Sequence, residues 1–311
     1  MGDATAVDRD AAEAWIGAYV EPAGAIELLH DEPWAAVLRV PVRDGVVWFK
    51  ECRSVQAFEP ALTAALYARW PDRIAEVLAW DEKRAWLLLA DAGAPIGAFT
   101  DIPGAPPSGN MPEDWERALP LYAELQRGET AHAAEHLARG VPDLRVDTLP
   151  ARYEAMLARN DLPVDAAEIE RLRRFAPRFA ELCAELAARG IPDSIQHDDL
   201  HLANVYEHDG RYRILDWGDS SVAHPFETLV VTFEHVELTV PAGDPWYARL
   251  RDAYLEPWGE DLVDTFELAF RVGTIAHVVA NVRQLDHLPP GAVRDKFPRR
   301  LAEVVRRAPT D

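Results

Sequence analysis

The densest group of reactive side chains in the sequence lies between residues 197 and 219. The segment HDDLHLAN (197–204) is followed, after a predicted hairpin turn at 208–210, by DWGD (216–219). A loop carboxylate can orient an attacking hydroxyl, while an asparagine and a second aspartate offer the hard oxygen ligands that Mg²⁺ prefers between phosphates. This spacing therefore indicates phosphoryl transfer from ATP to a hydroxyl group.

The first of these motifs matches a known family pattern at most of its positions. The sequence resembles the aminoglycoside phosphotransferase (phosphotransferase enzyme) family, a branch of the protein-kinase-like fold. That family has a His-Gly-Asp-Leu-His-Pro-Gly-Asn loop, followed by Asp-Trp-Gly-Asp or a close variant. The positions that match are His197, Asp199, Leu200, His201 and Asn204, and those that depart are Asp198, Leu202 and Ala203.

The resemblance implies a role for each acidic or amide residue of the two motifs. The Asp-x₄-Asn spacing selects Asp199, rather than its neighbour Asp198, as the catalytic base or hydroxyl-orienting group. Asn204 and Asp216 would be ligands of Mg²⁺. Asp219 belongs to the same signature and would support the metal or the loop.

The two histidines of the first motif could instead form a metal pair with Asp199. Their His-x₃-His spacing suits zinc only on a helix, and strand signals flank this segment. We therefore expect His197 and His201 to be structural, with hydrogen bonds to the loop backbone or to Asp216.

A kinase-like fold also needs a strand lysine that holds the ATP phosphates and a helix glutamate that positions it. The chain has three lysines and 29 arginines, and Lys50 ends the predicted strand VVWFK (46–50). A lysine kept there suggests a need for a compact ammonium group. Glu59, at the start of the next predicted helix, is the expected partner, because Glu51 must point to the opposite face of the strand.

By the same resemblance, the end of the fifth predicted strand is the hinge between two lobes. Backbone groups of Leu89, Ala90 and Asp91 would hydrogen-bond the adenine. The family's glycine-rich phosphate loop is not evident, because the segment HDEPW (30–34) joins the first two strands. The sequence leaves open how the triphosphate is covered and whether ATP or GTP is preferred.

The elements around these residues predict an α+β, protein-kinase-like fold with two lobes. Residues 1–91 would form the N-terminal nucleotide-binding lobe, with a small antiparallel sheet and one main helix, and residues 92–111 look too rich in proline and glycine for regular structure. Residues 92–311 would form a larger, mostly helical catalytic and substrate-binding lobe, with ATP in the cleft between the two. Helices are expected at 11–19, 58–70, 113–138, 149–159, 164–190, 225–238, 246–255 and 262–285, and strands at 26–30, 35–40, 46–50, 74–80 and 84–89.

Composition narrows the possible partners and the compartment. The 311 residues carry a formal net charge of −21, which disfavours nucleic acid and anionic membranes as partners. Two cysteines fit a reducing cytosol, and neither a signal peptide nor a membrane-spanning stretch is visible, so we expect a cytoplasmic protein. The sequence does not indicate an oligomeric state.

The resemblance implies a small-molecule hydroxyl acceptor, such as an aminoglycoside or an amino sugar, but does not identify it. Acidic residues of the later helices could hold a cationic acceptor, although solvated helix faces are the favoured interpretation. Four aromatic residues could stack on a sugar ring, although core packing is favoured. The acidic residues are Glu227, Glu234, Glu237, Glu267 and Asp286, and the aromatic ones are Trp246, Tyr247, Tyr254 and Trp258.

Two other functions stay open at this stage. A non-catalytic, kinase-like binding protein would normally lack the base, a metal ligand or the strand lysine, and all of these are present here. A zinc metallohydrolase is suggested by HAAEH (132–136), an inverted zinc-protease motif on a predicted helix. No third ligand for His132 and His136 is identifiable, which makes this the less favoured alternative.

Overall fold

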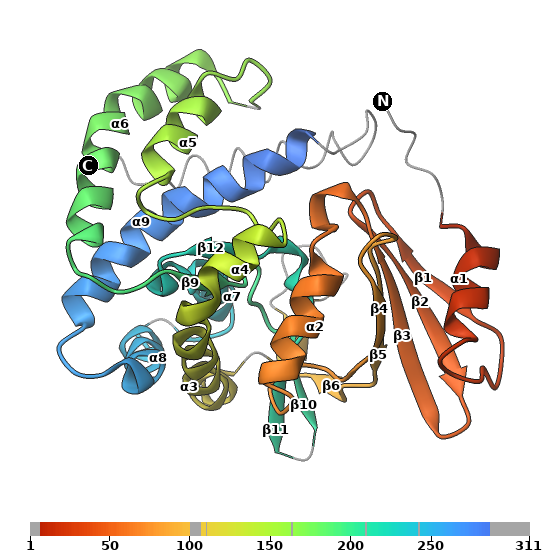
Figure 1. Cartoon of the computed structure of the whole chain (residues 1–311). Helices are drawn as coiled ribbons and strands as arrows, with labels where there is room; N and C mark the ends of the chain where they lie inside the picture. The colour runs from red at the N-terminus through yellow and green to blue at the C-terminus, as the bar shows by residue number, and fades with distance from the viewer. Residues whose placement is uncertain are drawn as a thin grey trace. The chain divides into compact units, whose positions relative to one another are not determined.

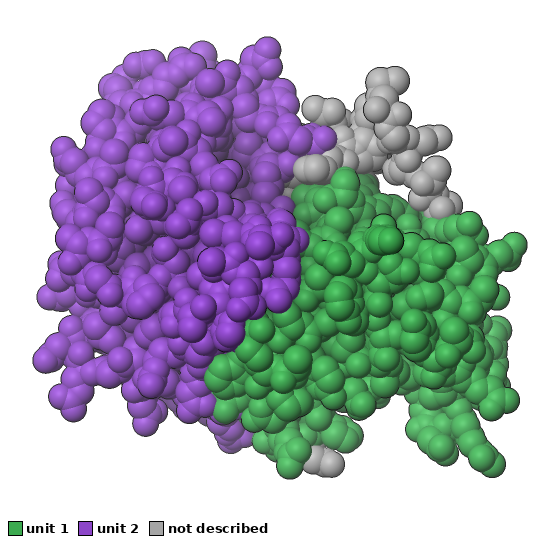
Figure 2. Space-filling model, in the orientation of Figure 1, with its two compact units in different colours: residues 1–96, 203–219, 287–289 green, residues 97–202, 220–286, 290–311 purple. Residues whose placement is uncertain are grey.

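A computed structural model describes residues 7–99, 107–109, 111–162, 164–208, 210–241 and 243–286 (Figure 1). The chain divides into two compact units (Figure 2). The first unit holds the described residues of 1–96 and 203–219, and the second holds those of 97–202 and 220–286. Residues 203–219, which include Asn204 and Asp216, thus group with the N-terminal residues. The lobe boundary after residue 91 stays a prediction.

The first unit is built on a five-stranded antiparallel sheet, as the sequence predicts. The strand order is β1-β2-β3-β5-β4, and the long β2–β3 pairing runs from Ala35 opposite Cys52 to Val42 opposite Gly45. The chain turns at Arg43 and Asp44, and Gly45, the glycine of the Asp-Gly hairpin signal, begins β3. The strands are β1 (Glu27–Asp31), β2 (Ala35–Val42), β3 (Gly45–Cys52), β4 (Val77–Asp81) and β5 (Trp86–Ala90).

Each face of this sheet has its own environment because neighbouring strand residues point to opposite sides. Phe49 belongs to a hydrophobic core together with α1 (Arg9–Ile16), and the Trp15 ring lies 5.8 Å from its ring. Lys50, the next residue, faces the side of α2 (Glu59–Arg69). Alternation along β3 therefore separates an apolar face from a face that carries charge.

A hairpin from far along the chain completes the first unit. Strands β10 (Val205–His208) and β11 (Arg211–Ile214) pair antiparallel, and β6 (Ala94–Pro95) adds to β10. A Cβ atom at Gly93 would lie 2.6 Å from the carbonyl oxygen of Glu207, so the approach of β6 requires glycine there. The expectation that residues 92–111 lack regular structure is therefore wrong for β6, and also for β7 (Gly97–Ala98) and β8 (Ser108–Gly109). Residues 100–106 and 110 lie outside the described residues.

The second unit is mostly helical, and its helices follow the predicted segments with two breaks. The helix expected at 113–138 is interrupted at Thr130, and the one expected at 225–238 begins as a short 3-10 turn. Strands β9 (Ser194–Gln196) and β12 (Ser221–Ala223) pair within it. The helices are α3 (Pro112–Glu129), α4 (Ala133–Ala138), α5 (Leu149–Leu157), α6 (Ala166–Ala187), α7 (Val230–Glu237), α8 (Trp246–Leu255) and α9 (Val263–Val282), with 3-10 turns η2 (Thr130–His132), η4 (Pro225–Glu227), η5 (Glu256–Trp258) and η6 (Arg283–Asp286).

Aromatic side chains from α7, α8 and α9 pack together in the second unit. The ring centres of Trp246 and Tyr247 lie 5.2 and 5.0 Å from that of Phe233. The Trp258 ring lies 5.2 Å from that of Phe226, and Tyr254 is fully buried. Core packing, the favoured interpretation of these four aromatic residues, is confirmed for Tyr254, whereas the other three pack against aromatic rings and are half-buried. Among the described helices, none combines the length and apolar character needed to cross a bilayer.

Candidate functional site

The strand lysine of the first unit is held between two carboxylates. Lys50 Nζ lies 2.6 Å from Oε2 of Glu59 and donates a hydrogen bond of 2.6 Å to Oδ1 of Asp216. Burial opposes the charge of Lys50, but the two carboxylates outweigh that effect and raise its pKa well above the usual value. Glu59 is therefore the partner of Lys50, as expected, and the pair also contacts the aspartate that the sequence assigns to the metal.

A third residue on this face of β3 was not found from the sequence. Cys52 lies two positions after Lys50, so its side chain points to the same side of the strand. Its Sγ donates a hydrogen bond of 3.2 Å to the same Oε2 atom of Glu59. Burial raises the pKa of the Cys52 thiol well above its usual value, which keeps the thiol protonated and able to donate. The sequence did contain a signal for Cys52, because side chains two positions apart on a strand point to the same face.

The two predicted metal ligands lie beside each other at the open end of the β10–β11 hairpin. Asn204 and Asp216 flank the pairing of Val205 with Ile214, and the Leu215 N–H donates to the Asn204 carbonyl oxygen at 2.9 Å. Asp216 has a φ of 62°, a left-handed conformation that aspartate tolerates better than most residues. Its side chain is 48% exposed. An amide and an accessible carboxylate at one hairpin end suit Mg²⁺, which binds few protein ligands.

The rest of the second motif follows as the 3-10 turn η3 (Trp217–Asp219). Trp217 is fully buried, and its Nε1 donates to the Ile214 carbonyl oxygen at 3.2 Å. A Cβ atom at Gly218 would collide with the end of the buried Gln56 side chain of η1 (Ser54–Gln56), so glycine lets this turn pack against Gln56 as it lies. Asp219 ends the turn, and its predicted supporting role stays a prediction.

The predicted hinge residues Leu89 and Ala90 end strand β5, and Asp91 follows it. Leu89 pairs with Trp48 and Ala90 with Val47. The Ala90 N–H already donates to the Glu76 carbonyl oxygen at 2.9 Å, and Asp91 accepts a hydrogen bond of 3.2 Å from the indole of Trp48. Adenine recognition by these residues stays a prediction, and these contacts favour backbone groups other than the Ala90 N–H.

In the second unit, the predicted catalytic carboxylate lies next to a histidine of the same loop. His201 Nε2 is 3.3 Å from Oδ2 of Asp199, whose side chain is 27% exposed. The His201 ring packs against Phe99 and His235, at 5.0 and 5.6 Å between ring centres. These rings fix the orientation of His201, and His201 in turn restricts the carboxylate of Asp199.

The loop that carries Asp199 is anchored on both sides by residues from distant helices. The His197 N–H donates to the Tyr122 hydroxyl at 3.0 Å, and this hydroxyl lies 2.7 Å from Oγ1 of Thr228. On the other side, Thr232 Oγ1 donates to the Leu200 carbonyl oxygen at 2.6 Å. Tyr122, Thr228 and Thr232 were not identified from the sequence.

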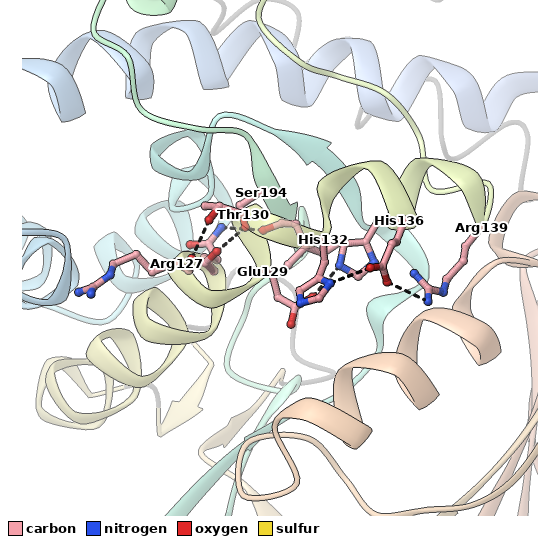
Figure 3. A network of polar contacts seen from close by, with 10 residues as sticks. Arg127, Glu129, Thr130, His132, His136, Arg139 and Ser194 are labelled. Atoms are coloured by element: carbon pink, nitrogen blue, oxygen red, sulfur yellow. Dashed lines mark hydrogen bonds and ion pairs between the residues drawn. The ribbon is translucent and has the colours of Figure 1, made fainter.

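The two histidines of the HAAEH segment bind different carboxylates. His136 Nε2 lies 2.7 Å from Oε2 of Glu129, and both side chains are fully buried (Figure 3). His132 Nδ1 instead lies 2.9 Å from Oε1 of Glu135. In the described part of the chain, no three His, Cys, Asp or Glu side chains form a metal-binding group. The zinc-ligand interpretation of His132 and His136 thus gains no support, because each histidine already has a separate carboxylate partner.

Comparisons with known proteins show the family of this chain and its fold. A family model described as the phosphotransferase enzyme family matches residues 26–266. A glucosamine kinase from Streptacidiphilus jiangxiensis is 25% identical over 284 residues, and the match covers 71% of this chain and 63% of that protein. The chain thus spans less than two thirds of this relative's length.

Solved structures of small-molecule phosphotransferases share the fold. A macrolide 2′-phosphotransferase from Brachybacterium faecium has a TM-score of 0.63 at 15% identity, covering 96% of this chain and 98% of that one. A choline kinase from Streptococcus pneumoniae has a TM-score of 0.63 at 12% identity, with the same coverage of 96% and 98%. The α+β, protein-kinase-like fold expected from the sequence is therefore confirmed. Since the family model spans most of the chain, this protein belongs to the phosphotransferase enzyme family.

Proposed function

We propose that this protein transfers the γ-phosphoryl group of ATP to a hydroxyl of a small molecule, with Mg²⁺ as the metal. The observation that supports this most is the position of Lys50, whose ammonium group lies 2.6 Å from both Glu59 and Asp216. A buried lysine fixed in this way offers its charge at one defined point, as binding of a phosphate group requires. An ordinary surface lysine needs no such buried carboxylate.

Each chemical function that the reaction needs then has a residue in this chain. Lys50 would bind the nucleotide phosphates, positioned by Glu59, and Asn204 and Asp216 would hold Mg²⁺. The metal, when bound, neutralises charge on the phosphate oxygens. Asp199 would orient the acceptor hydroxyl and accept its proton late in the transfer, while His201 holds the Asp199 carboxylate in place.

An amino sugar or a related amine is the acceptor class that we favour. The glucosamine kinase relative is named for such a substrate. The net charge of −21 also favours the approach of a cationic acceptor over an anionic one. Two of the five acidic side chains considered for this site are engaged elsewhere, because Glu267 pairs with Arg251 and Asp286 with Arg159.

The test is consumption of ATP by the purified full chain with MgCl₂, against a panel of amino sugars, aminoglycosides and amino alcohols. We expect turnover with at least one acceptor, and its loss in Asp199→Asn. Asp147→Asn, at an exposed position, is the matched control and should keep the wild-type rate. GTP in place of ATP measures the nucleotide preference. Equal turnover in wild type and Asp199→Asn would contradict the proposal, as would nucleotide binding without any turnover, which would favour a binding protein.

A further inference from the structure

A glutamate of the second unit is buried without a hydrogen-bond donor. Glu227, in η4, is 6% exposed, and neither Oε1 nor Oε2 has a hydrogen-bond partner among the described residues. The favoured expectation that Glu227 lies on a solvated helix face is therefore wrong. α9 packs so closely over it that a Cβ atom at Gly273 would lie 2.9 Å from the Glu227 Cα. An ionised carboxylate in such a place is unfavourable unless a proton or a cation neutralises it.

A second carboxylate lines the same cavity as Glu227. Asp198 directly precedes the predicted catalytic Asp199, and it occupies the position where the resembling family pattern has glycine. Its φ of 61° explains the glycine of that pattern, because this left-handed conformation favours residues without a Cβ. Ser221 Oγ donates a hydrogen bond to Asp198 Oδ2. The chain thus places a carboxylate at a backbone position where the family pattern has glycine, and this carboxylate lines the cavity.

The cavity that the two residues line has room for one water molecule. Its free volume is about 10 Å³, and polar groups of Asp198, Ser221, Glu227 and Thr228 line it, so that a water there would find several partners. Burial raises the pKa of Asp198 to about 6, although Ser221 and Arg283 oppose the shift. Burial and then the charge of Asp198 raise the pKa of Glu227 well above its usual value. The other titratable or charged groups near the two carboxylates are Asp193, Asp199, Cys183, His277 and Arg283.

We propose that Asp198 and Glu227 share one proton through a water in this cavity, and that this pair positions the loop that carries Asp199. Glu227 keeps the proton at neutral pH and donates to the water, which donates to the Asp198 carboxylate. The pair acts through Asp199, so both residues are positioning residues. Only this effect on Asp199 rests on the proposed phosphotransferase function. The alternative is that both carboxylates are ionised around a bound cation.

The melting temperature of Glu227→Gln as a function of pH tests the shared proton without any assay of activity. Because the pKa of Glu227 is higher in the folded state than its usual value of 4.5, the wild type loses stability as pH rises above that value. Glutamine keeps a donor and cannot ionise. We expect the variant to melt close to the wild type at pH 5 and to exceed it by about 2–4 °C or more at pH 9. Glu260→Gln, at an exposed position, should show a difference that does not change with pH.

Infrared difference spectra supply a second measurement on the same full-length proteins. We expect the band of a protonated carboxyl group in the wild type at pH 7, and its absence in Glu227→Gln. A melting temperature of Glu227→Gln below the wild type at every pH would overturn the proposal. So would stabilisation of the wild type, but not of the variant, by KCl relative to choline chloride, which would indicate a bound cation.

The positioning role has its own readout in the acceptor assay. We expect kcat to fall in the order wild type, Glu227→Gln, Glu227→Leu, and to fall in Asp198→Gly, while the KM for ATP stays unchanged. Equal kcat in all four proteins would overturn the positioning role. If the wild type shows no turnover with any acceptor, the proposed function fails, whereas the melting and infrared measurements still decide whether the proton is shared.

Discussion

The two units contain two buried ionisable clusters that are neutralised in different ways. In the first unit, Lys50 has a carboxylate 2.6 Å away on either side. In the second unit, Glu227 has no hydrogen-bond donor among the described side chains and backbone groups, and another carboxylate lines its cavity. A buried ion pair needs its partner in place, whereas a buried acid can take up a proton. The first cluster therefore depends on geometry and the second on pH.

The largest effects that we expect from substitutions in the two units are on the rate of ATP turnover. Asp199→Ala removes the group that orients the hydroxyl, and a positioned acid or base contributes about 10²–10⁴-fold to the rate of such reactions. We expect a loss of that size in steady-state ATP consumption. The melting temperature should stay close to that of the wild type, because the Asp199 side chain is 27% exposed. Unfolding of this variant would instead show that Asp199 is structural.

Asp216→Ala tests the Lys50 cluster of the first unit by the same assay. Loss of a metal ligand should abolish turnover and raise the MgCl₂ concentration needed for ATP binding. Lys50 keeps Glu59 as a partner, so the fold should survive. If Asp216→Ala bound ATP and Mg²⁺ as the wild type does, the assignment of this residue to the metal would be wrong.

The next largest effect is on the free energy of unfolding and comes from breaking the buried ion pair of Lys50 and Glu59. Lys50→Met leaves the carboxylate of Glu59 without its cation at a position where the side chain is 2% exposed. Removing one partner of a buried ion pair costs about 3–5 kcal/mol in the free energy of unfolding. We expect a loss of that order by urea denaturation, together with loss of turnover. Lys83→Met, at an exposed position, is the control.

The double variant Lys50→Met, Glu59→Leu separates the two roles of this pair. With both charges removed, most of the stability should return, because an apolar pair of similar size can replace a buried ion pair. Turnover should not return. A double variant as unstable as Lys50→Met alone would show that packing, rather than the unpaired charge, causes the loss.

The first cluster could be predicted from the sequence because its parts lie in elements that the sequence also predicts. Lys50 and Glu59 are nine residues apart, on a strand and on the helix that follows it, and the strand period excludes Glu51. The pairing of Val205 with Ile214 similarly follows from the spacing of the two motifs around a turn. The five-stranded sheet and most of the helices could be predicted for the same reason, namely that hydrophobic period and turn signals act locally.

The second cluster and the loop that carries Asp199 could not be predicted because distant segments build them. Tyr122 reaches the His197 backbone across 75 residues, and Thr232 reaches Leu200 across 32. The burial of Glu227 depends on the packing of α9, which no local pattern encodes. Its place at the start of a predicted helix suggested a solvated face, and this interpretation failed. The catalytic and metal-binding roles of Asp199, Asn204, Asp216 and Asp219 stay predictions.

A smaller effect tests how firmly the distant anchors hold the loop of the second unit. Tyr122→Phe removes the hydroxyl that accepts from the His197 N–H and leaves that buried donor without this partner. We expect a loss of about 1–3 kcal/mol in the free energy of unfolding, the usual cost of such a buried group. The kcat should fall while the KM for ATP is unchanged. Tyr19→Phe, on an exposed side chain, should change neither quantity.

The smallest expected effect comes from comparing the two buried cysteines, of which Cys52 donates a hydrogen bond to a carboxylate. Cys52→Ser keeps a donor for Oε2 of Glu59, whereas the Cys183 thiol on α6 makes no hydrogen bond among the described residues, although Glu227 lies near enough to raise its pKa. Both cysteines are buried, so the size of the change is the same. We expect Cys183→Ser to lose about 1 kcal/mol more in the free energy of unfolding than Cys52→Ser, because only the group at position 52 already donates a hydrogen bond to a carboxylate. Equal losses by urea denaturation would mean that the thiol contact with Glu59 contributes nothing, and that Lys50 alone positions the glutamate.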